Sequence, residues 1–186
     1  MGWRCFLAAE LPLKGVQSAA DLIKRLSGQI PRGKVRWVDP AQLHLTLHFL
    51  GNDVGRETVN VMAAQGREIA GRTSPFAVTL EKLATLPPAG PARVIILPCG
   101  DPAGNLIQLR RAFLPTIASL GLPHDVRQWL PHVTLGRVKS TVGKLPELSA
   151  TDTNPQLITM LTLYQSILTV DGPEYAKLAE FPLGSR

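Results

Sequence analysis

The stretch Leu43-His-Leu-Thr-Leu-His-Phe-Leu-Gly51 alternates apolar and polar side chains with the two-residue period of a β-strand. In such a strand Leu43, Leu45 and Leu47 point into a hydrophobic core, whereas the polar side chains of His44, Thr46 and His48 point to the opposite face. Alternation places Phe49 on the core side, where we expect it to pack rather than to contact a ligand. The same pattern of histidine, apolar residue, threonine and apolar residue returns about half the chain later, at His132-Val133-Thr134-Leu135.

Two imidazoles and two hydroxyls would form a compact phosphate site if both strands border one groove. A histidine with its ordinary pKa of about 6.5 exchanges protons at neutral pH, so His44 and His132 can act as an acid and a base. Thr46 and Thr134 can donate hydrogen bonds to phosphate oxygens. One His-x-Thr sequence is more typical of a structural histidine, whereas two copies favour a shared site. No residue cluster has metal-ligand spacing, so we expect neither a metal nor another cofactor.

Strands and helices are mixed along the rest of the chain. Strand patterns cover residues 4–9, 34–38, 43–50, 75–80, 93–97, 130–138, 158–170 and 175–181. Helical patterns run from Pro12 to Leu26, over 57–70 and over 104–120, where Pro115 predicts a kink. Gly66 should weaken the second helix by about 1 kcal/mol relative to alanine. The pattern predicts an α+β fold with helices over one face of each sheet, in one domain spanning 1–186.

Composition favours an anionic partner without identifying it. Lysine and arginine number 20 against 14 acidic residues, for a net charge of +6. Cys5 and Cys99 are far apart in sequence and are typical of buried thiols in a reducing compartment. The sequence contains no signal-peptide pattern and no apolar run of about 20 residues. We therefore expect a cytoplasmic monomer without a membrane segment.

The sequence resembles the two-histidine phosphoesterase superfamily, and within it the LigT-like RNA 2′,3′-cyclic phosphodiesterases, also called 2′–5′ RNA ligases. The resemblance covers nearly the whole chain and rests on the two motifs in register. Further matching stretches are Arg4-Cys-Phe-Leu-Ala-Ala9, Val35-Arg-Trp-Val38, Arg127-Gln-Trp-Leu-Pro131, Gly136-Arg137, and Leu163-Tyr-Gln-Ser166 with Tyr175. The resemblance implies a bilobal, pseudo-twofold fold in which two interleaved lobes each contribute one His-x-Thr motif. An antiparallel sheet in each lobe would face a central cleft, with helices outside.

The same resemblance implies that the partner is RNA with a 2′,3′-cyclic phosphate end, which is hydrolysed to a 2′-phosphate. By this analogy His44 protonates the leaving 3′ oxygen, His132 activates water, and the two threonines hold the phosphate. Arg127 and Arg137 match family positions and would pair with phosphate. Each lies an odd number of residues from His132, which strict alternation places on the opposite face. Gly136 could permit a bulge that re-aims Arg137.

Two further residues are weaker candidates for substrate contacts. His48 stands where the family usually has arginine, so we expect it either to line the groove, with a weaker or pH-dependent contact to RNA, or to be an exposed bystander. Trp129 precedes the second motif and is a candidate platform for stacking a base. Two alternative functions remain open: reversible 2′–5′ ligation or cleavage by the same histidines, and RNA-end binding without turnover.

Overall fold

The computed structural model describes residues 2–123, 129–143, 145–146, 148–150, 152, 154–170 and 172–184. Its strands are β1 (Trp3–Glu10), β2 (Val35–Trp37), β3 (His44–Val54), β4 (Phe76–Leu80), β5 (Ala84–Leu86), β6 (Val94–Gly100), β7 (His132–Val138), β8 (Gln156–Ile158), β9 (Met160–Thr169) and β10 (Gly172–Pro182). Its helices are α1 (Leu13–Ser27), α2 (Arg56–Arg72), α3 (Asn105–Ala112), α4 (Leu114–Ser119) and the short 3-10 turn η1 (Pro40–Gln42). None of these described helices is long and apolar enough to cross a membrane.

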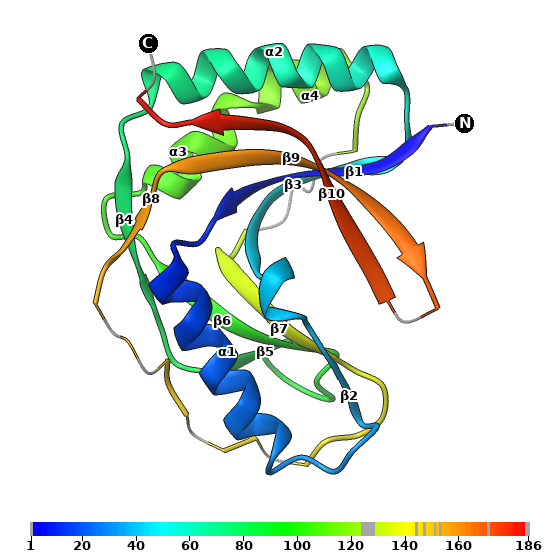
Figure 1. Cartoon of the computed structure of the whole chain (residues 1–186), viewed down its shortest axis with the longest axis vertical. Coiled ribbons are helices and arrows are strands. Elements are labelled where there is room, and N and C mark those ends of the chain that lie inside the picture. The colour runs from blue at the N-terminus through cyan, green and yellow to red at the C-terminus, as the bar shows by residue number, and fades with distance from the viewer. Residues whose placement is uncertain are drawn as a thin grey trace.

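The strands form one curled antiparallel sheet in the order β10-β9-β1-β3-β7-β6-β4-β8 (Figure 1). In addition, β2 pairs with β7 and β5 pairs with β6. The first half of the sheet ends at β3 and the second half begins at β7, and the two halves join through Leu45 and Val133. The predicted α+β architecture of antiparallel strands with helices outside is confirmed, and both His-x-Thr motifs lie on the strands at this junction.

The helices cover the outer face of the sheet, away from the junction's polar side chains. Helix α2 packs against β9 and β10, and α3 contacts β3 (Figure 1). Helix α1 follows β1 in sequence but contacts β7 of the second half, through an apolar stripe at helical spacing. The buried side chains of that stripe are Ala19, Leu22, Ile23 and Leu26. Helix α3 follows β6 and packs on the first half, so the chain crosses between the halves.

The predicted kinked helix over 104–120 is wrong in one respect, because the structure breaks it in two. Helix α3 ends at Ala112 and α4 begins at Leu114. Pro115 lies in the first turn of α4, where the backbone N–H that proline lacks would have no partner within the helix. A new helix start accommodates the proline ring without the steric clash that a continuous helix would impose.

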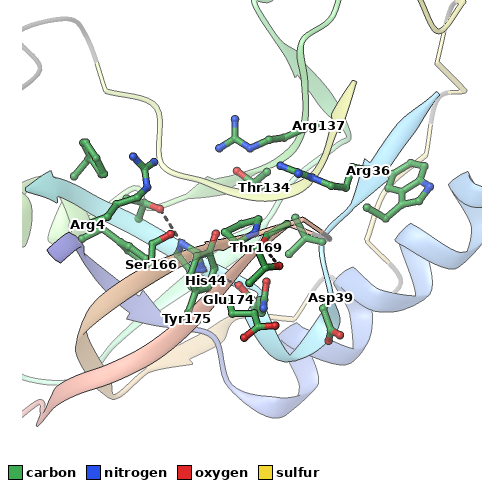
Figure 2. A pocket seen from close by; sticks show the side chains of 18 residues that line it. Arg4, Arg36, Asp39, His44, Thr134, Arg137, Ser166, Thr169, Glu174 and Tyr175 are labelled. Atoms are coloured by element: carbon green, nitrogen blue, oxygen red, sulfur yellow. Dashed lines mark hydrogen bonds between the residues drawn. The ribbon is translucent and has the colours of Figure 1, made fainter. Parts of the chain in front are cut away.

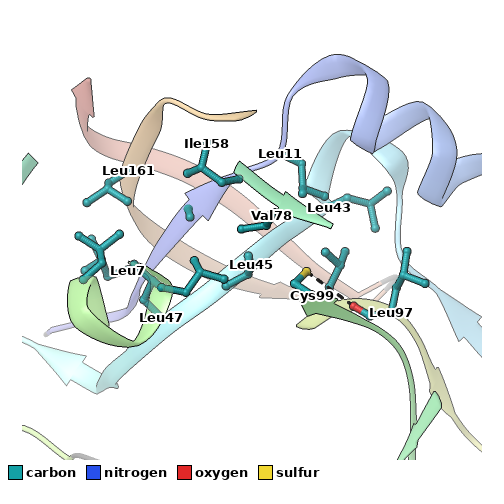
Figure 3. Close-up of a cluster of buried hydrophobic side chains, with 14 of the residues drawn as sticks. Leu7, Leu11, Leu43, Leu45, Leu47, Val78, Leu97, Cys99, Ile158 and Leu161 are labelled. Atoms are coloured by element: carbon teal, nitrogen blue, oxygen red, sulfur yellow. Dashed lines mark hydrogen bonds between the residues drawn. The ribbon is translucent and has the colours of Figure 1, made fainter. Parts of the chain in front are cut away.

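A hydrophobic core lies under the sheet and fixes the inward face of β3 and its neighbours. Figure 3 shows Leu45 and Leu47 of β3 beside side chains from several other strands. Those fully or nearly fully buried around them are Leu7, Val78, Leu97, Cys99, Ile158 and Leu161. Burial raises the pKa of Cys5 to about 11 and that of Cys99 to about 12, so neither thiol forms a reactive thiolate at neutral pH.

Candidate active site

The two His-x-Thr motifs face each other across the junction between the halves of the sheet. Leu45 of β3 and Val133 of β7 are antiparallel partners. One residue to either side, this register sets His44 opposite Thr134 and Thr46 opposite His132. Because alternate residues share a face, the leucine and valine side chains point to the core while the four polar side chains share the other face. The convergence predicted from the repeated motif is therefore present.

His44 is held by two hydrogen bonds to residues close in sequence. Its Nδ1 lies 2.7 Å from the Gln42 carbonyl oxygen, and its Nε2 lies 2.9 Å from Thr46 Oγ1. A carbonyl only accepts, so Nδ1 carries the proton and the Thr46 hydroxyl donates to Nε2 in the neutral imidazole. The turn signal at Asp39 sets up this geometry, because Asp39 Oδ1 accepts a hydrogen bond from Ala41 N and caps the turn that ends at Gln42.

His132 repeats the same arrangement on the second strand. Its Nδ1 lies 2.7 Å from the carbonyl oxygen of Leu130, again two residues upstream. Each imidazole is therefore fixed in the tautomer that leaves Nε2 able to accept a proton. The equivalence of the two histidines extends from sequence to hydrogen bonding.

Both imidazoles have lowered pKa values in the free protein. Burial is the main cause of the fall in the pKa of His44 from 6.5 to about 4; the bond to Gln42 opposes this and the neighbouring His132 adds to it. The pKa of His132 is lowered mainly by burial and further by Arg137, against the bond to Leu130. Both histidines are neutral at pH 7 without ligand, so both begin as proton acceptors.

Aromatic rings support His44 from the first half of the sheet. The ring of Phe6 stacks on the imidazole with centroids 4.8 Å apart, and Tyr175 meets the imidazole edge-on at 5.3 Å. Tyr164 also stacks on Phe6, with centroids 5.1 Å apart, and lies 6.0 Å from the imidazole. These contacts fix the imidazole plane and account for much of its desolvation.

A carboxylate anchors the strands that carry these rings. Glu10 Oε1 accepts hydrogen bonds from Thr162 Oγ1 at 2.7 Å and from the Tyr164 hydroxyl at 2.9 Å, and Lys177 Nζ lies 2.7 Å from it. Burial raises the pKa of Glu10, but these donors outweigh burial and the net shift is downward. The ionised carboxylate thereby ties β9 and β10 to β1 beneath the aromatic cluster.

Both motif strands contain a β-bulge at the same distance from the histidine. On β3, Ala8 pairs with Thr46 but Leu7 pairs with His48, which leaves Leu47 as the extra residue. On β7, Ile96 pairs with Thr134 but Ile95 pairs with Gly136, so the residue between them is the extra one. Each bulge shifts the alternation that follows it. The residue five positions after each histidine therefore lies on the histidine's side of the sheet.

These bulges confirm one prediction and overturn another. Arg137 lines the groove, as a bulge at Gly136 was expected to permit. Phe49 was expected in the core, but its side chain lines the groove and is 38% exposed. Its ring lies 4.4 Å from the guanidinium carbon of Arg4. Strict alternation fails at Phe49 because the bulge at Leu47 adds a residue to the strand.

The same bulge turns His48 away from the groove, so the prediction that it would line the groove or be exposed is wrong. His48 is only 4% exposed, and its Nε2 lies 2.7 Å from the carbonyl oxygen of Arg110. Trp129 is not among the residues that line the groove either. Its ring instead contacts Arg110, whose guanidinium carbon lies 5.3 Å from the ring centroid. Arg127 lies outside the described residues, and its role stays a prediction.

A cavity of about 440 Å³ opens over the motif face (Figure 2). Its lining includes His44, Thr46 and Thr134. His132 is not among the lining residues, but the pairing of Leu45 with Val133 sets it opposite Thr46, which does line the cavity. Sequence reasoning missed Arg4, Arg36 and several residues of the β9–β10 hairpin, which are Ser166, Thr169, Gly172, Pro173, Glu174 and Tyr175.

Three guanidinium groups surround the cavity and make it a site for anions. Arg4, Arg36 and Arg137 each lower the pKa of Tyr175, although burial dominates and the net shift is upward. Arg4 and Arg36 lie within stretches that match the family, and each is separated by one residue from another groove residue, Phe6 or Val38. In a strand, a spacing of two residues indicates a shared face, and this was the sequence signal that could have placed Arg4 and Arg36 in the groove. Among the described residues no group of three His, Cys, Asp or Glu side chains is arranged to hold a metal.

Solved structures share this fold over nearly their whole length. A protein of Thermus thermophilus superimposes with a TM-score of 0.87 at 25% identity, covering 97% of this chain and 98% of that chain. E. coli LigT in complex with 3′-AMP gives a TM-score of 0.81 at 26% identity, covering 98% of this chain and 99% of that chain. The molecule therefore has the LigT-like fold.

Sequence comparisons lead to the family. The model of the 2′-5′ RNA ligase superfamily matches residues 16–158. A protein of Aquifex aeolicus named RNA 2′,3′-cyclic phosphodiesterase is 28% identical over 177 residues, covering 92% of this chain and 93% of that protein. One of the same name from Aeropyrum pernix is 30% identical over 159 residues, covering 81% and 88%. The chain belongs to the 2′-5′ RNA ligase superfamily, as the resemblance predicted.

Proposed function

We propose that this protein hydrolyses the 2′,3′-cyclic phosphate at an RNA end to a 2′-phosphate, with His44 and His132 as the acid and base. The observation that carries the proposal is the pairing of two His-x-Thr motifs across one β-bridge, with each imidazole anchored through Nδ1. The relatives named RNA 2′,3′-cyclic phosphodiesterase support the same activity.

In the proposed reaction His132 Nε2 takes a proton from a water molecule as the water oxygen attacks phosphorus. The bond between phosphorus and the 3′ oxygen breaks, and His44 Nε2 donates a proton to that oxygen. The hydroxyls of Thr46 and Thr134 donate hydrogen bonds to the non-bridging oxygens, where charge develops. One water is consumed, and the products are a 2′-phosphate and a 3′-hydroxyl.

Because the pKa of His44 is lowered in the free protein, His44 takes up the proton it later donates, from solvent, only when the substrate binds. A phosphodiester anion next to the imidazole favours the charged form and raises the pKa of His44. The hydroxyl of Thr46 can then exchange its donation to Nε2 for donation to phosphate. Burial, and to a smaller extent Arg137, lowers the pKa of His132, so this imidazole is unprotonated and free to accept a proton. Different neighbours, aromatic rings at His44 and Arg137 at His132, thus distinguish two otherwise equivalent histidines.

Replacing one atom of the substrate tests these roles. In a cyclic phosphorothiolate with sulfur as the 3′ leaving atom, the departing thiolate needs no proton. On the oxygen substrate, His44→Ala and His132→Ala should each lower kcat by about 10²- to 10⁴-fold. On the sulfur substrate, His44→Ala should recover most of its activity and His132→Ala should not.

His48→Asn is the matched control, because it removes an imidazole that lies outside the groove. It should keep activity within a few-fold on both substrates. Full activity in either motif variant would refute the proposal, and the opposite rescue pattern would exchange the two roles. Binding of cyclic-phosphate RNA without product would instead identify an RNA-end binding protein.

A second candidate is reversible formation or cleavage of 2′–5′ linkages by the same histidines. The groove favours it in one respect, since Phe49 with Arg4 lies on one side of the motifs and Arg137 with Arg36 on the other. Two nucleosides joined through one phosphate would contact both sides. Incubation of a 2′–5′ dinucleotide, or of cyclic-phosphate RNA with a 5′-hydroxyl RNA, distinguishes this activity by its products.

We also propose that the protein acts as a cytoplasmic monomer and needs no metal. Support comes from its two buried free thiols, which suit a reducing compartment, and from acid–base chemistry that its own side chains can supply. Light scattering during gel filtration tests the oligomeric state. Full activity in a chelating buffer tests the independence from metal.

A further inference from the structure

Two pairs of cations lie side by side where the groove leaves the motifs. Arg36 of β2 and Arg137 of β7 are antiparallel partners. The pairing continues outward, because Lys139 N donates a hydrogen bond of 2.8 Å to the Lys34 carbonyl oxygen. Lys34 lies in the bend directly before β2, one residue from Arg36 across buried Val35. Lys139 lies in the bend directly after β7, one residue from Arg137 across half-buried Val138.

These four side chains have no carboxylate partner within the described part of the chain. The ion pairs described there join Arg72 to Glu68 and join Lys177 to Glu10 and Glu180. Like charges directly opposite on neighbouring strands are destabilising. An array of this kind is therefore suited to an anion that the protein itself does not provide.

The array extends in one direction from the catalytic strands. Along β7 the groove side carries Thr134 and then Arg137, and Lys139 lies in the bend just beyond the end of the strand, where a two-residue step covers about 7 Å. Lys34 Nζ donates one hydrogen bond of 2.9 Å to the Thr141 carbonyl oxygen, which orients it and leaves two N–H groups. Lys139 is exposed. The lysine pair is thus separate from the cavity and adjoins the end of the cavity that Arg36 and Arg137 line.

The opposite end of the groove lacks such an array among the residues described there. At that end β3 carries Asn52 and Asp53, and the nearest cation, Arg4, is engaged with Phe49 and with Asn52. The cavity's own carboxylates are Asp39, which caps the turn at Ala41, and Glu174 on the facing hairpin. Charge therefore directs a polyanion toward the end formed by β2 and β7. Figure 2 shows Arg36 and Arg137 near each other at that end.

We propose that Lys34 and Lys139 bind the phosphodiester that precedes the terminal nucleotide of an RNA strand. The proposal rests on the proposed function, since it places the cyclic phosphate at the two histidines. Arg36 and Arg137 then lie between the two phosphates, beside the terminal nucleotide. The preferred substrate is accordingly an oligonucleotide end rather than a cyclic mononucleotide.

The experiment compares a nucleoside 2′,3′-cyclic phosphate with a short RNA that ends in the same nucleotide. The double variant Lys34→Gln with Lys139→Gln should lower kcat/KM about three- to tenfold for the RNA and leave the mononucleotide unchanged within twofold. The plot of log kcat/KM against log salt for RNA should become shallower by about 0.7 for one lost phosphate contact. Lys139→Gln alone keeps the Lys34 bond to Thr141 and should show a smaller loss in the same direction.

A double variant on α1, Lys24→Gln with Arg25→Gln, matches the change in net charge at exposed positions. It should leave both substrates and the salt dependence unchanged. Equal losses on both substrates, no loss on RNA, or the same loss in the α1 variant would each overturn the proposal. Failure of the unaltered protein to hydrolyse either substrate would count against the proposed function instead.

Discussion

Phe49 and Arg137 occupy equivalent positions on the two motif strands, each turned into the groove by a bulge directly after the motif threonine. One strand thereby supplies an aromatic face and the other supplies a guanidinium. The groove is symmetric in its acid–base groups and asymmetric in what flanks them. In the proposed reaction, this asymmetry gives the two near-identical histidines different surroundings on opposite sides of one phosphate.

The bulge on β7 depends on the absence of a side chain at Gly136. A Cβ there would lie 2.7 Å from Val35 Cγ1 and 2.9 Å from Trp37 Cε3. Gly136→Ala should therefore lower the free energy of unfolding by about 1–3 kcal/mol and raise KM by displacing Arg137. Thermal denaturation and steady-state kinetics measure both effects. Gly143→Ala is the control, since nothing lies within 4 Å of its added Cβ.

The Thr46 hydroxyl should contribute to kcat rather than to folding. Thr46→Val keeps the shape and removes the donor, so kcat should fall about 10- to 1000-fold, as for other oxyanion donors. Thr46→Ser keeps a hydroxyl and should retain most of the activity. Single-turnover rates provide the measurement. Equal rates for the valine and serine variants would show that the hydroxyl is not used.

Stability should fall as the solution is acidified, because His44 resists protonation in the folded protein. Its pKa is about 4 when folded and 6.5 ordinarily, so the unfolded chain binds more protons between these values and is favoured as pH falls. The shift corresponds to at most about 3 kcal/mol, less what partial exposure to solvent screens. Urea unfolding at pH 7.5 and pH 4.5 should show a smaller loss for His44→Gln than for the unaltered protein.

Gly66→Ala should destabilise the protein, contrary to the expectation from helix propensity. Propensity alone favours alanine in α2 by about 1 kcal/mol. A Cβ at Gly66, however, would lie 2.5 Å from Cε2 of Phe181, which is buried against the helix. Overpacking of this kind costs about 1–3 kcal/mol. Ala64→Gly on the exposed side of the same helix should also destabilise, so unfolding of the two variants separates packing from propensity.

The sequence was sufficient to predict the fold class and the shared face of the two motif histidines and threonines, because a period of two and a repeated motif can be read directly from the residues. It failed at Phe49 and His48 because a bulge depends on pairing with β1, which the strand's own residues do not reveal. Arg137 could be predicted only conditionally, through the glycine beside it. Arg36 reaches the groove because β2 pairs with β7, a partner distant in sequence.

The crossing of the chain between the halves has a consequence for how the molecule can be divided. A fragment that ends before β7 contains α1 but not the strand on which α1 packs, and it contains one histidine but not the other. Neither half can therefore be excised as a smaller, weaker enzyme. Strand β7 completes both the hydrophobic core under α1 and the pair of motif histidines. The protein should therefore gain its folded structure and its activity together, in one cooperative folding transition.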